Sequence, residues 1–196
     1  MTRQRRLAQL DPASLTDDQR DLYDEIVGGR RSGGPQHFRI ADDEGRLQGP
    51  FNAFLSAPTI GAPLAALGAA IRYESSLDDR AREIAILVVA AAWDSDFEQY
   101  AHEPIARAAG IDDHELASIR AGASADTTAR WPDAADLTLV RVTRSLVDRG
   151  DLDDDLYAEA VDVLGEAGLF ELTALVGYYA MLALQLRVFD VGVPGQ

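Results

Sequence analysis

Three polar side chains share one helical stripe in the segment from residue 95 to residue 110. Ser95, Glu98 and His102 are separated by three and four residues, and these spacings place their side chains on one face of an α-helix. A carboxylate one turn from an imidazole has two interpretations. It is either a proton-transfer couple or an exposed ion pair of small energetic weight. The neighbouring residues have to decide between them.

The residues around this pair favour burial. The segment directly follows a nearly unbroken apolar run, EIAILVVAAA, at residues 83–92. Its own alanines and isoleucine cover more of its circumference, and Trp93, Phe97 and Tyr100 supply bulky walls nearby. A Glu–His pair held partly out of water becomes a couple for proton transfer. We therefore interpret Glu98 and His102 as candidate catalytic residues.

Glu83 is the next candidate, because it lies where the preceding segment changes from charged to apolar. One interpretation is a carboxylate in the first turns of a helix that interacts favourably with the helix dipole. The other is a carboxylate that reaches across a helix pair toward Ser95 and His102. The apolar residues from Ile84 onward draw this helix inside the protein, which keeps the second interpretation open.

The composition bounds the partners of the chain. Its 33 acidic and 18 basic residues give a formal net charge of −15. Such an excess repels phosphate backbones and anionic lipid headgroups, so we expect no nucleic-acid partner and no membrane partner. A short basic cluster at residues 3–6 lacks the apolar segment of a signal peptide, and we expect a cytoplasmic location.

The residue inventory also restricts the chemistry. The chain contains no cysteine, so it can form neither a thiolate nucleophile nor a thiolate metal site. Its three histidines do not have the paired spacing of a metal site, and we predict no metal. His37 and His114 are interpreted as solvated residues. Phosphate-binding loops, dinucleotide fingerprints and nucleophile elbows are absent from the sequence.

The positions of turns and capping residues predict a helical protein. Thr16 with Gln19, and Asp112 with Glu115, are capping-box patterns. Further helices are expected from Ala62-Pro63 to Tyr73, from a Ser76 cap through Trp93, and from Asp94 or Ser95 to Gly110. Three more are expected at residues 132–149, 151–164 and 169–189. The expected fold is an all-α bundle of seven or eight helices without significant strands.

The chain is expected to form a single domain over residues 1–196. Residues 1–10 are interpreted as a flexible arm and residues 28–50 as a long loop. The most apolar segment, LTALVGYYAMLAL at residues 172–184, is shorter than the roughly 20 residues of a membrane-spanning helix. It is interpreted as a buried helix that packs on several sides, including those of another subunit.

Four segments together resemble the carboxymuconolactone decarboxylase and alkylhydroperoxidase superfamily. They are GPFNAFLSAP at 49–58, LGAAIRYESSLDDRAREIAIL at 67–87, the S-x-x-E-x-x-x-H-x-x-x-A-x-x-x-G pattern at 95–110, and LVGYYAMLALQLRVFDVGVP at 175–194. The resemblance covers roughly residues 48–190. It implies an alkylhydroperoxidase-like all-α fold and a homo-oligomer, a trimer or a hexamer.

The peroxidase branch of this superfamily carries C-x-x-C-x-x-x-H, with a glutamate one helix earlier in a proton relay. By position, its cysteines fall on Ser95 and Glu98, its histidine on His102 and its earlier glutamate on Glu83. The spacing is preserved, but both sulfur atoms are missing. Serine and glutamate cannot replace the thiol that reacts with peroxide or the thiol that resolves the product, so thiol peroxidase activity is excluded.

The cysteine-free pattern with an upstream Gly-Pro-Phe-Asn segment is similar to the decarboxylase branch. The resemblance implies loss of carbon dioxide from a small carboxylated lactone without a cofactor, as in aromatic catabolism. The site then has to stabilise a dienolate oxyanion and protonate carbon. His102 is the expected proton donor or oxyanion partner, Glu98 orients it or shuttles the proton, and Glu83 is the third catalytic candidate.

A small anionic organic substrate also needs binding groups. Arg72 is expected to hold its carboxylate by a bidentate fork and Asn52 to offer an amide hydrogen bond, with Ser95 as a third candidate. Arg72 is otherwise a surface arginine near a helix end, and Tyr178 and Tyr179 either line the pocket or pack. Two alternatives to the lyase stay open. The scaffold catalyses another proton transfer, as an isomerase, cyclase or hydrolase, or it is a non-catalytic oligomer that binds a small molecule.

Overall fold

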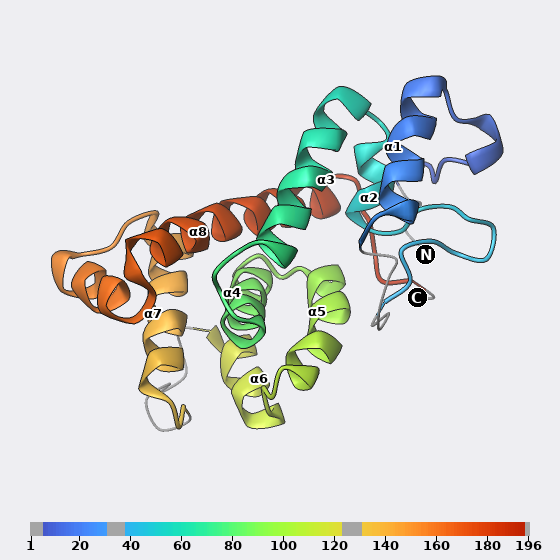
Figure 1. Cartoon of the computed structure of the whole chain (residues 1–196). Coiled ribbons are helices and arrows are strands. Elements are labelled where there is room, and N and C mark those ends of the chain that lie inside the picture. Colours follow the sequence, from blue (N-terminus) through green and yellow to red (C-terminus); the bar gives the residue numbers. More distant parts are fainter. Residues whose placement is uncertain (1–5, 31–37, 123–130, 195–196) are drawn as a thin grey trace. The chain divides into compact units, whose positions relative to one another are not determined.

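The computed structural model describes residues 6–30, 38–122 and 131–194. Over these ranges the chain forms eight α-helices and one short 3-10 helix, and its extended backbone is limited to an isolated bridge between Ala41 and Leu47. The elements are η1 (Pro12–Ser14), α1 (Asp17–Gly28), α2 (Pro50–Phe54), α3 (Pro58–Tyr73), α4 (Asp79–Ala92), α5 (Asp96–Ala108), α6 (Asp113–Arg120), α7 (Ala134–Arg149) and α8 (Asp154–Val188) (Figure 1). The prediction of an all-α fold with seven or eight helices is confirmed.

Local capping signals set several of the helix starts. Thr16 and Gln19 form a reciprocal capping box at the start of α1, and Asp112 and Glu115 form a second one at the start of α6, as the sequence predicts. The predicted start of α3 near residues 62–63 was wrong. Pro58 is the first residue of α3, a position where the missing backbone N–H of proline breaks no helical hydrogen bond.

Two of the predicted helices are joined in α8. The helix is assigned without interruption from Asp154 to Val188, but Gly165 has φ 70° and ψ 167°, which are not helical values. A positive φ is accessible to glycine at little cost, so the chain changes direction there. The start of α8 also differs from the prediction, because Asp153 and not Asp151 accepts a hydrogen bond from a first-turn amide, that of Leu156.

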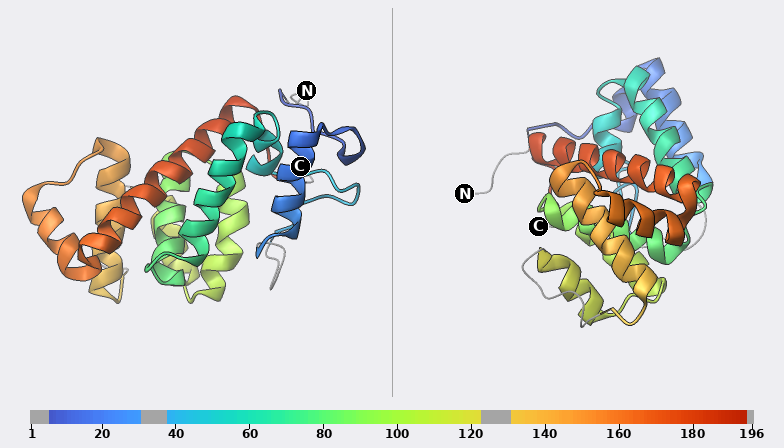
Figure 2. Two further views of the ribbon diagram at one scale, coloured as in Figure 1. Left: turned by 45° about the horizontal axis from the view of Figure 1, so that its top comes forward. Right: turned by 90° about the vertical axis from the view of Figure 1, so that its left-hand side faces the viewer.

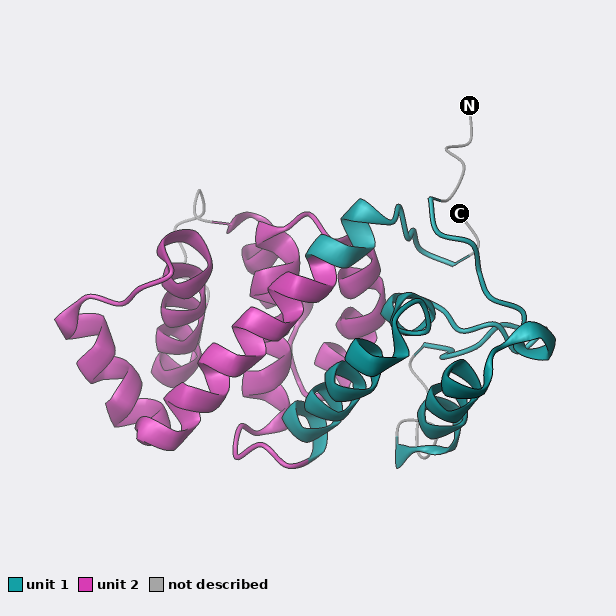
Figure 3. Ribbon diagram, turned by 90° about the horizontal axis from the view of Figure 1, so that it is seen from above, with its two compact units in different colours: residues 1–73, 184–196 teal, residues 74–183 magenta. Residues whose placement is uncertain are grey.

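The chain divides into two compact units (Figure 3). Unit 1 comprises residues 1–73 and 184–196, and unit 2 comprises residues 74–183. In unit 1, α3 packs against both α1 and α2. Gly61 permits the second contact, because a Cβ atom at this position would lie only 2.3 Å from the carbonyl oxygen of Phe54.

In unit 2, α4 is the central helix. Its residues 82–90 are all buried, and α5, α6 and α7 each pack against it. Two further views of the ribbon show these helices around α4 (Figure 2). A helix that is apolar on every side is stable only when it is covered on every side, and the run IAILVVA at residues 84–90 meets that condition here.

A charged cluster fixes the first turn of α4 against its neighbours. The Arg80 guanidinium donates to Asp136 of α7 at 2.8 Å, to Glu115 of α6 at 2.6 Å and to the carbonyl oxygen of Gly110 at 2.6 Å. Glu115 is nearly inaccessible to solvent. This cluster was not predicted from the sequence, because its members lie 30 to 56 residues away from Arg80.

Helix α8 is long and apolar enough to cross a membrane by length and composition alone, and about half of its most apolar window is buried inside the protein. Core helices of soluble proteins pass the same test. Leu172, Leu175 and Leu182 are buried, which agrees with the interpretation of residues 172–184 as a core helix.

Candidate functional site

Helix α4 carries Glu83 into the interior of unit 2. The helix is capped by Asp78, whose carboxylate accepts a hydrogen bond from the amide of Ala81 at 2.7 Å. The predicted cap, Ser76, was wrong. Its hydroxyl group instead donates to Glu171 at 2.8 Å. Glu83 lies in the second turn and its side chain is 0% exposed.

Helix α5 carries the other two charged groups of the site. Ser95 is its N-cap residue, and its amide donates to the carbonyl oxygen of Ala90, so a tight turn joins α4 to α5. The Ser95 side chain makes no capping hydrogen bond, although the residue is buried. Glu98 and His102, one turn apart, are also buried, on the face of α5 that packs inward.

The imidazole of His102 lies between two carboxylates. Its Nδ1 atom is 2.7 Å from Oε2 of Glu83, and its Nε2 atom is 3.4 Å from Oε2 of Glu98. The His102 and Glu98 side chains are only 8% and 4% exposed. The structure therefore brings together Glu83, Glu98 and His102, the three predicted catalytic residues, from two adjacent helices.

The two contacts of the imidazole differ in kind. The contact with Glu83 has the length of a charge-assisted hydrogen bond, whereas the contact with Glu98 exceeds the usual range for N–H···O bonds. An ionised carboxylate can only accept, so with Glu83 ionised the shorter contact places a proton on Nδ1 of His102. Glu83 thus fixes the orientation of the ring, and the Nε2 edge is the less constrained one.

Tyr179 completes the surroundings of His102. The two rings meet edge to face, with centroids 5.3 Å apart and planes at 85°. Tyr178 packs in the same manner on Tyr179, with centroids 5.5 Å apart. Sequence reasoning left these two tyrosines as either packing or pocket-lining residues, and it did not place Tyr179 against the imidazole. The buried Tyr-Tyr pair on an apolar helix was the available signal.

A carboxylate two turns before Tyr179 ties α8 to the segment that precedes α4. Oε2 of Glu171 accepts hydrogen bonds from the Ser75 hydroxyl at 2.9 Å and from the Ser76 amide and hydroxyl, both at 2.8 Å. Burial raises the pKa of the Glu171 carboxyl, but these hydrogen bonds outweigh it and hold the pKa below its ordinary value. The register of α8, and with it the position of Tyr179, is anchored by this contact.

A buried oxygen of Glu83 accepts no hydrogen bond from the described residues. Oε1 of Glu83 is buried and has no donor within hydrogen-bond distance there. Among the described residues, Glu83 forms no ion pair with an arginine, and His102 is its one ionic partner there. A buried carboxylate oxygen without a donor is costly.

No group of three histidine, aspartate or glutamate side chains in the described ranges is arranged to hold a metal ion.

The other predicted binding residues, Arg72 and Asn52, lie in unit 1. The Arg72 guanidinium is 5.8 Å from the ring centroid of the adjacent Tyr73. Asn52 is buried, accepts a hydrogen bond from the amide of Leu10 at 2.9 Å and donates one to the carbonyl oxygen of Ala8 at 3.0 Å. The substrate-binding roles of Arg72, Asn52 and Ser95 stay predictions.

Hydrogen bonds also hold parts of the two segments that the sequence predicts to be irregular, the arm at residues 1–10 and the loop at residues 28–50. Residues 1–5 of the predicted flexible arm and residues 31–37 of the predicted long loop lie outside the described residues. The described end of the arm is held by Asn52 and by a hydrogen bond from Arg6 to the carbonyl oxygen of Val188. Within the loop, Asp42 accepts hydrogen bonds from both the amide and the side chain of Arg46, each at 2.8 Å.

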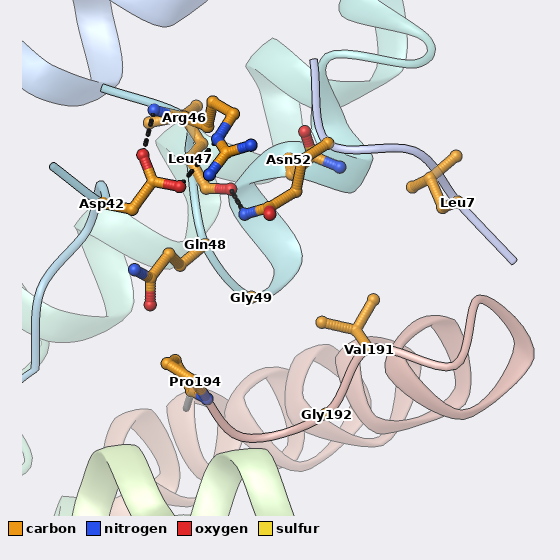
Figure 4. A pocket seen from close by; sticks show the side chains of 11 residues that line it. Leu7, Asp42, Arg46, Leu47, Gln48, Gly49, Asn52, Val191, Gly192 and Pro194 are labelled. Carbon is orange, nitrogen blue, oxygen red and sulfur yellow. Dashed lines mark hydrogen bonds and ion pairs between the residues drawn. The ribbon is translucent and has the colours of Figure 1, made fainter. Parts of the chain in front are cut away.

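Asn52 also lines a cavity of about 230 Å³ within unit 1 (Figure 4). Polar side chains of the connection between α1 and α2 form one side, and residues after α8 form the other. The lining includes Gln9, Asp42, Arg46, Gln48, Val191 and Pro194. Sequence reasoning found Asn52 alone among these residues.

Comparisons with known proteins are consistent with the fold. Residues 58–139 match the model of the carboxymuconolactone decarboxylase family. No curated protein matches the chain in sequence. Among solved structures, the chain is similar to an alkylhydroperoxidase AhpD core, an uncharacterized peroxidase-related protein from Ralstonia eutropha JMP134. The TM-score is 0.74 at 11% identity, over 100% of this chain and 95% of the other. At that identity the likeness concerns the fold.

Proposed function

We propose, from the match of residues 58–139 to the model of the carboxymuconolactone decarboxylase family, that this chain is a decarboxylase-like lyase that acts by proton transfer. Its substrate is a small carboxylated lactone or a related carboxylic acid, and the reaction needs no cofactor. The observation that carries the proposal is the burial of the His102 imidazole between the Glu83 and Glu98 carboxylates.

The reaction requires an electron sink and a proton donor. When the carboxylate of the substrate is vinylogous to the lactone carbonyl, cleavage of its C–C bond releases carbon dioxide and moves the electron pair into a dienolate. A protonated imidazole stabilises the developing oxyanion and then gives up the one proton that reaches carbon by way of Glu98. The ring returns to its starting state by taking one proton from solvent, so the reaction is balanced without an oxidant or a metal.

Each residue of the cluster has a distinct role in this proposal. Glu83 holds Nδ1 of His102 and stabilises the imidazolium, in the way that a buried carboxylate supports a catalytic histidine in other enzymes. The looser contact leaves Nε2 of His102 as the edge that meets the substrate. Glu98, on that same side, carries the proton between the ring and the reacting carbon.

The absence of cysteine separates this chain from thiol-based peroxidases. The solved structure that shares its fold is described as peroxidase-related. Reduction of a peroxide by a thiol mechanism needs a thiolate to attack the O–O bond, and this chain has no cysteine. Proton transfer is the chemistry that its buried imidazole and carboxylates support.

A second candidate is an isomerase, because carboxylates flank the imidazole on both sides. Such an arrangement can remove a proton at one carbon and return it at another without loss of carbon dioxide. Two flanking carboxylates also disfavour the close approach of an anionic substrate. An isomerase can act on a neutral substrate, which does not meet this repulsion, whereas a decarboxylase acts on a carboxylate.

One assay separates these proposals. Purified protein without added metal is incubated in D2O with a γ-carboxylated unsaturated lactone, and carbon dioxide release and deuterium incorporation are both measured. The lyase predicts carbon dioxide release together with one deuterium at carbon in the product. Deuterium exchange without carbon dioxide release supports the isomerase and contradicts the lyase. Neither signal contradicts both.

A matched pair of variants tests the assignment of the site. His102→Ala is expected to lower turnover by about 10²- to 10⁴-fold, the usual contribution of a general acid–base group. His114→Ala, which removes an exposed histidine in the first turn of α6, is expected to leave turnover unchanged. Equal activity of both variants would place the chemistry elsewhere.

A further inference from the structure

The cavity of unit 1 has a polar wall and an apolar wall that face one another (Figure 4). The polar wall carries Asp42, Arg46 and Gln48, and the apolar wall is formed by Val191 and Pro194 on the segment after α8. At about 230 Å³ the cavity is smaller than the pockets that bind drug-sized ligands. It can hold a small organic molecule of about one ring.

Most of the polar groups in the wall are already paired. Asn52 uses its amide on the backbone of residues 8 and 10, and Arg46 donates from Nε to Asp42 at 2.8 Å and from Nη2 to Glu44 at 3.1 Å. The carboxamide of Gln48 is different. It is half-buried, it lines the cavity, and it makes no hydrogen bond with the described residues.

The local charge decides which ligands this wall accepts. The Arg46 guanidinium is flanked by two carboxylates, those of Asp42 and Glu44, which leaves an excess of one negative charge at the wall. An anion is therefore repelled, and the cation of the wall is already neutralised. A neutral molecule meets no such penalty, and its apolar part gains from contact with Val191 and Pro194.

We propose that this cavity binds a small neutral amide, of which a lactam is the simplest form. A carboxamide presents a donor and an acceptor side by side, so the Gln48 side chain pairs with an N–H and a C=O that lie adjacent in the ligand. The ring of the lactam lies against the apolar wall. Unit 1 thus contributes a ligand site of its own, and this proposal does not depend on the reaction proposed for unit 2.

Three probes of equal ring size test the chemical class. 2-Piperidone carries the adjacent N–H and C=O, cyclohexanone lacks the N–H, and cyclohexanecarboxylate is an anion. Each is titrated into the full chain, and backbone amide shifts are followed by ¹H–¹⁵N NMR. The expected dissociation constant of 2-piperidone is on the order of 1–10 mM for a ligand of this size, with shifts at residues 47–49 and 191–192. Cyclohexanone should bind at least about fivefold more weakly, and the anion weakest.

A substitution tests the residue. Gln48→Met keeps the length of the side chain and removes its amide, so 2-piperidone should bind about fivefold more weakly while cyclohexanone is unaffected. Gln99→Met, which removes a glutamine amide in α5 of unit 2, should change the binding of neither probe.

The proposal is overturned when cyclohexanone or the anion binds as tightly as the lactam, or when no probe shifts residues 47–49 at about 50 mM, well above that expected range. Unchanged lactam binding in Gln48→Met overturns it as well. The probe comparison on the unaltered chain remains decisive even if a variant does not fold.

Discussion

Unit 1 and unit 2 each bury polar side chains, but they satisfy them differently. In unit 1, Asn52 is buried and spends its amide on the backbone of residues 8 and 10. In unit 2, Glu83 is buried with one oxygen on His102 and the other without a donor among the described residues. A buried polar group that is paired with backbone holds a chain segment in place. A buried titratable group with an open position is poised for chemistry.

The difference between the buried polar groups of the two units is tested most sharply by removing the charge of Glu83. Glu83→Gln keeps the shape of the side chain. A carboxamide can donate as well as accept, so it does not fix the proton on Nδ1 of His102 as an ionised carboxylate does. Turnover is expected to fall by about 10²-fold or more, because the orientation of the ring is lost. Glu98→Gln should also reduce turnover. Steady-state kinetics give the loss, and an unchanged thermal midpoint shows that it is catalytic. Full activity of Glu83→Gln would remove that residue from the site.

The largest expected effect on stability lies in the cluster that anchors α4. Arg80→Met leaves the carboxylates of Glu115 and Asp136 without their cation in a mostly buried setting, and the free energy of unfolding should fall by about 2–4 kcal/mol. Arg141→Met breaks an exposed ion pair with Glu159 and should cost less than about 0.5 kcal/mol. Denaturant unfolding measures both. Equal losses would show that the Arg80 cluster is no more than a surface ion pair.

Asn52→Ala tests the counterpart in unit 1. The substitution leaves the amide of Leu10 and the carbonyl oxygen of Ala8 without their partner, and the expected loss in the free energy of unfolding is about 1–3 kcal/mol. Turnover per folded molecule should change little. A tenfold fall in kcat/KM with unchanged stability would instead support the substrate-binding role predicted for Asn52.

The smallest predicted effect concerns acid stability. Hydrogen bonds from Ser75 and Ser76 hold the pKa of Glu171 below its ordinary value, so its ionised form favours the folded state. This contribution is present above the ordinary pKa of glutamate, about 4.3, and is lost as the pH falls through the lower folded pKa. Glu171→Gln should therefore be less stable than the unaltered chain by about 1 kcal/mol near pH 7. The two stability curves should converge at low pH, and parallel curves from pH 3 to pH 7 would contradict this account.

Local signals in the sequence predicted what neighbouring residues decide. The capping boxes at Thr16 and Asp112 and the one-turn spacing of Glu98 and His102 needed only a few consecutive residues, and the structure contains all of them. The cap of α4 was missed because Ser76 and Asp78 are both good capping residues. The choice between them depends on Glu171, 95 residues away from Ser76, which occupies the serine hydroxyl.

Contacts between distant residues required the structure or the family resemblance. The pairing of Glu83 with His102 spans 19 residues, and the superfamily pattern, more than the local sequence, suggested it. The contact of Tyr179 with His102 and the use of Asn52 on residues 8 and 10 had no sequence signal of comparable strength. Packing of α-helices sets these contacts, and periodicity alone does not specify which helices meet.

The most direct test of the central claim reads the imidazole of His102 itself. Long-range ¹H–¹⁵N NMR of the chain, which has three histidines, reports which ring nitrogen of each carries the proton. We expect His102 to have its proton on Nδ1, in slow exchange with water, and Glu83→Gln to abolish this signature while His114 is unaffected. A His102 ring that averages between tautomers and exchanges as fast as His114 would contradict the claim that it is held between two buried carboxylates.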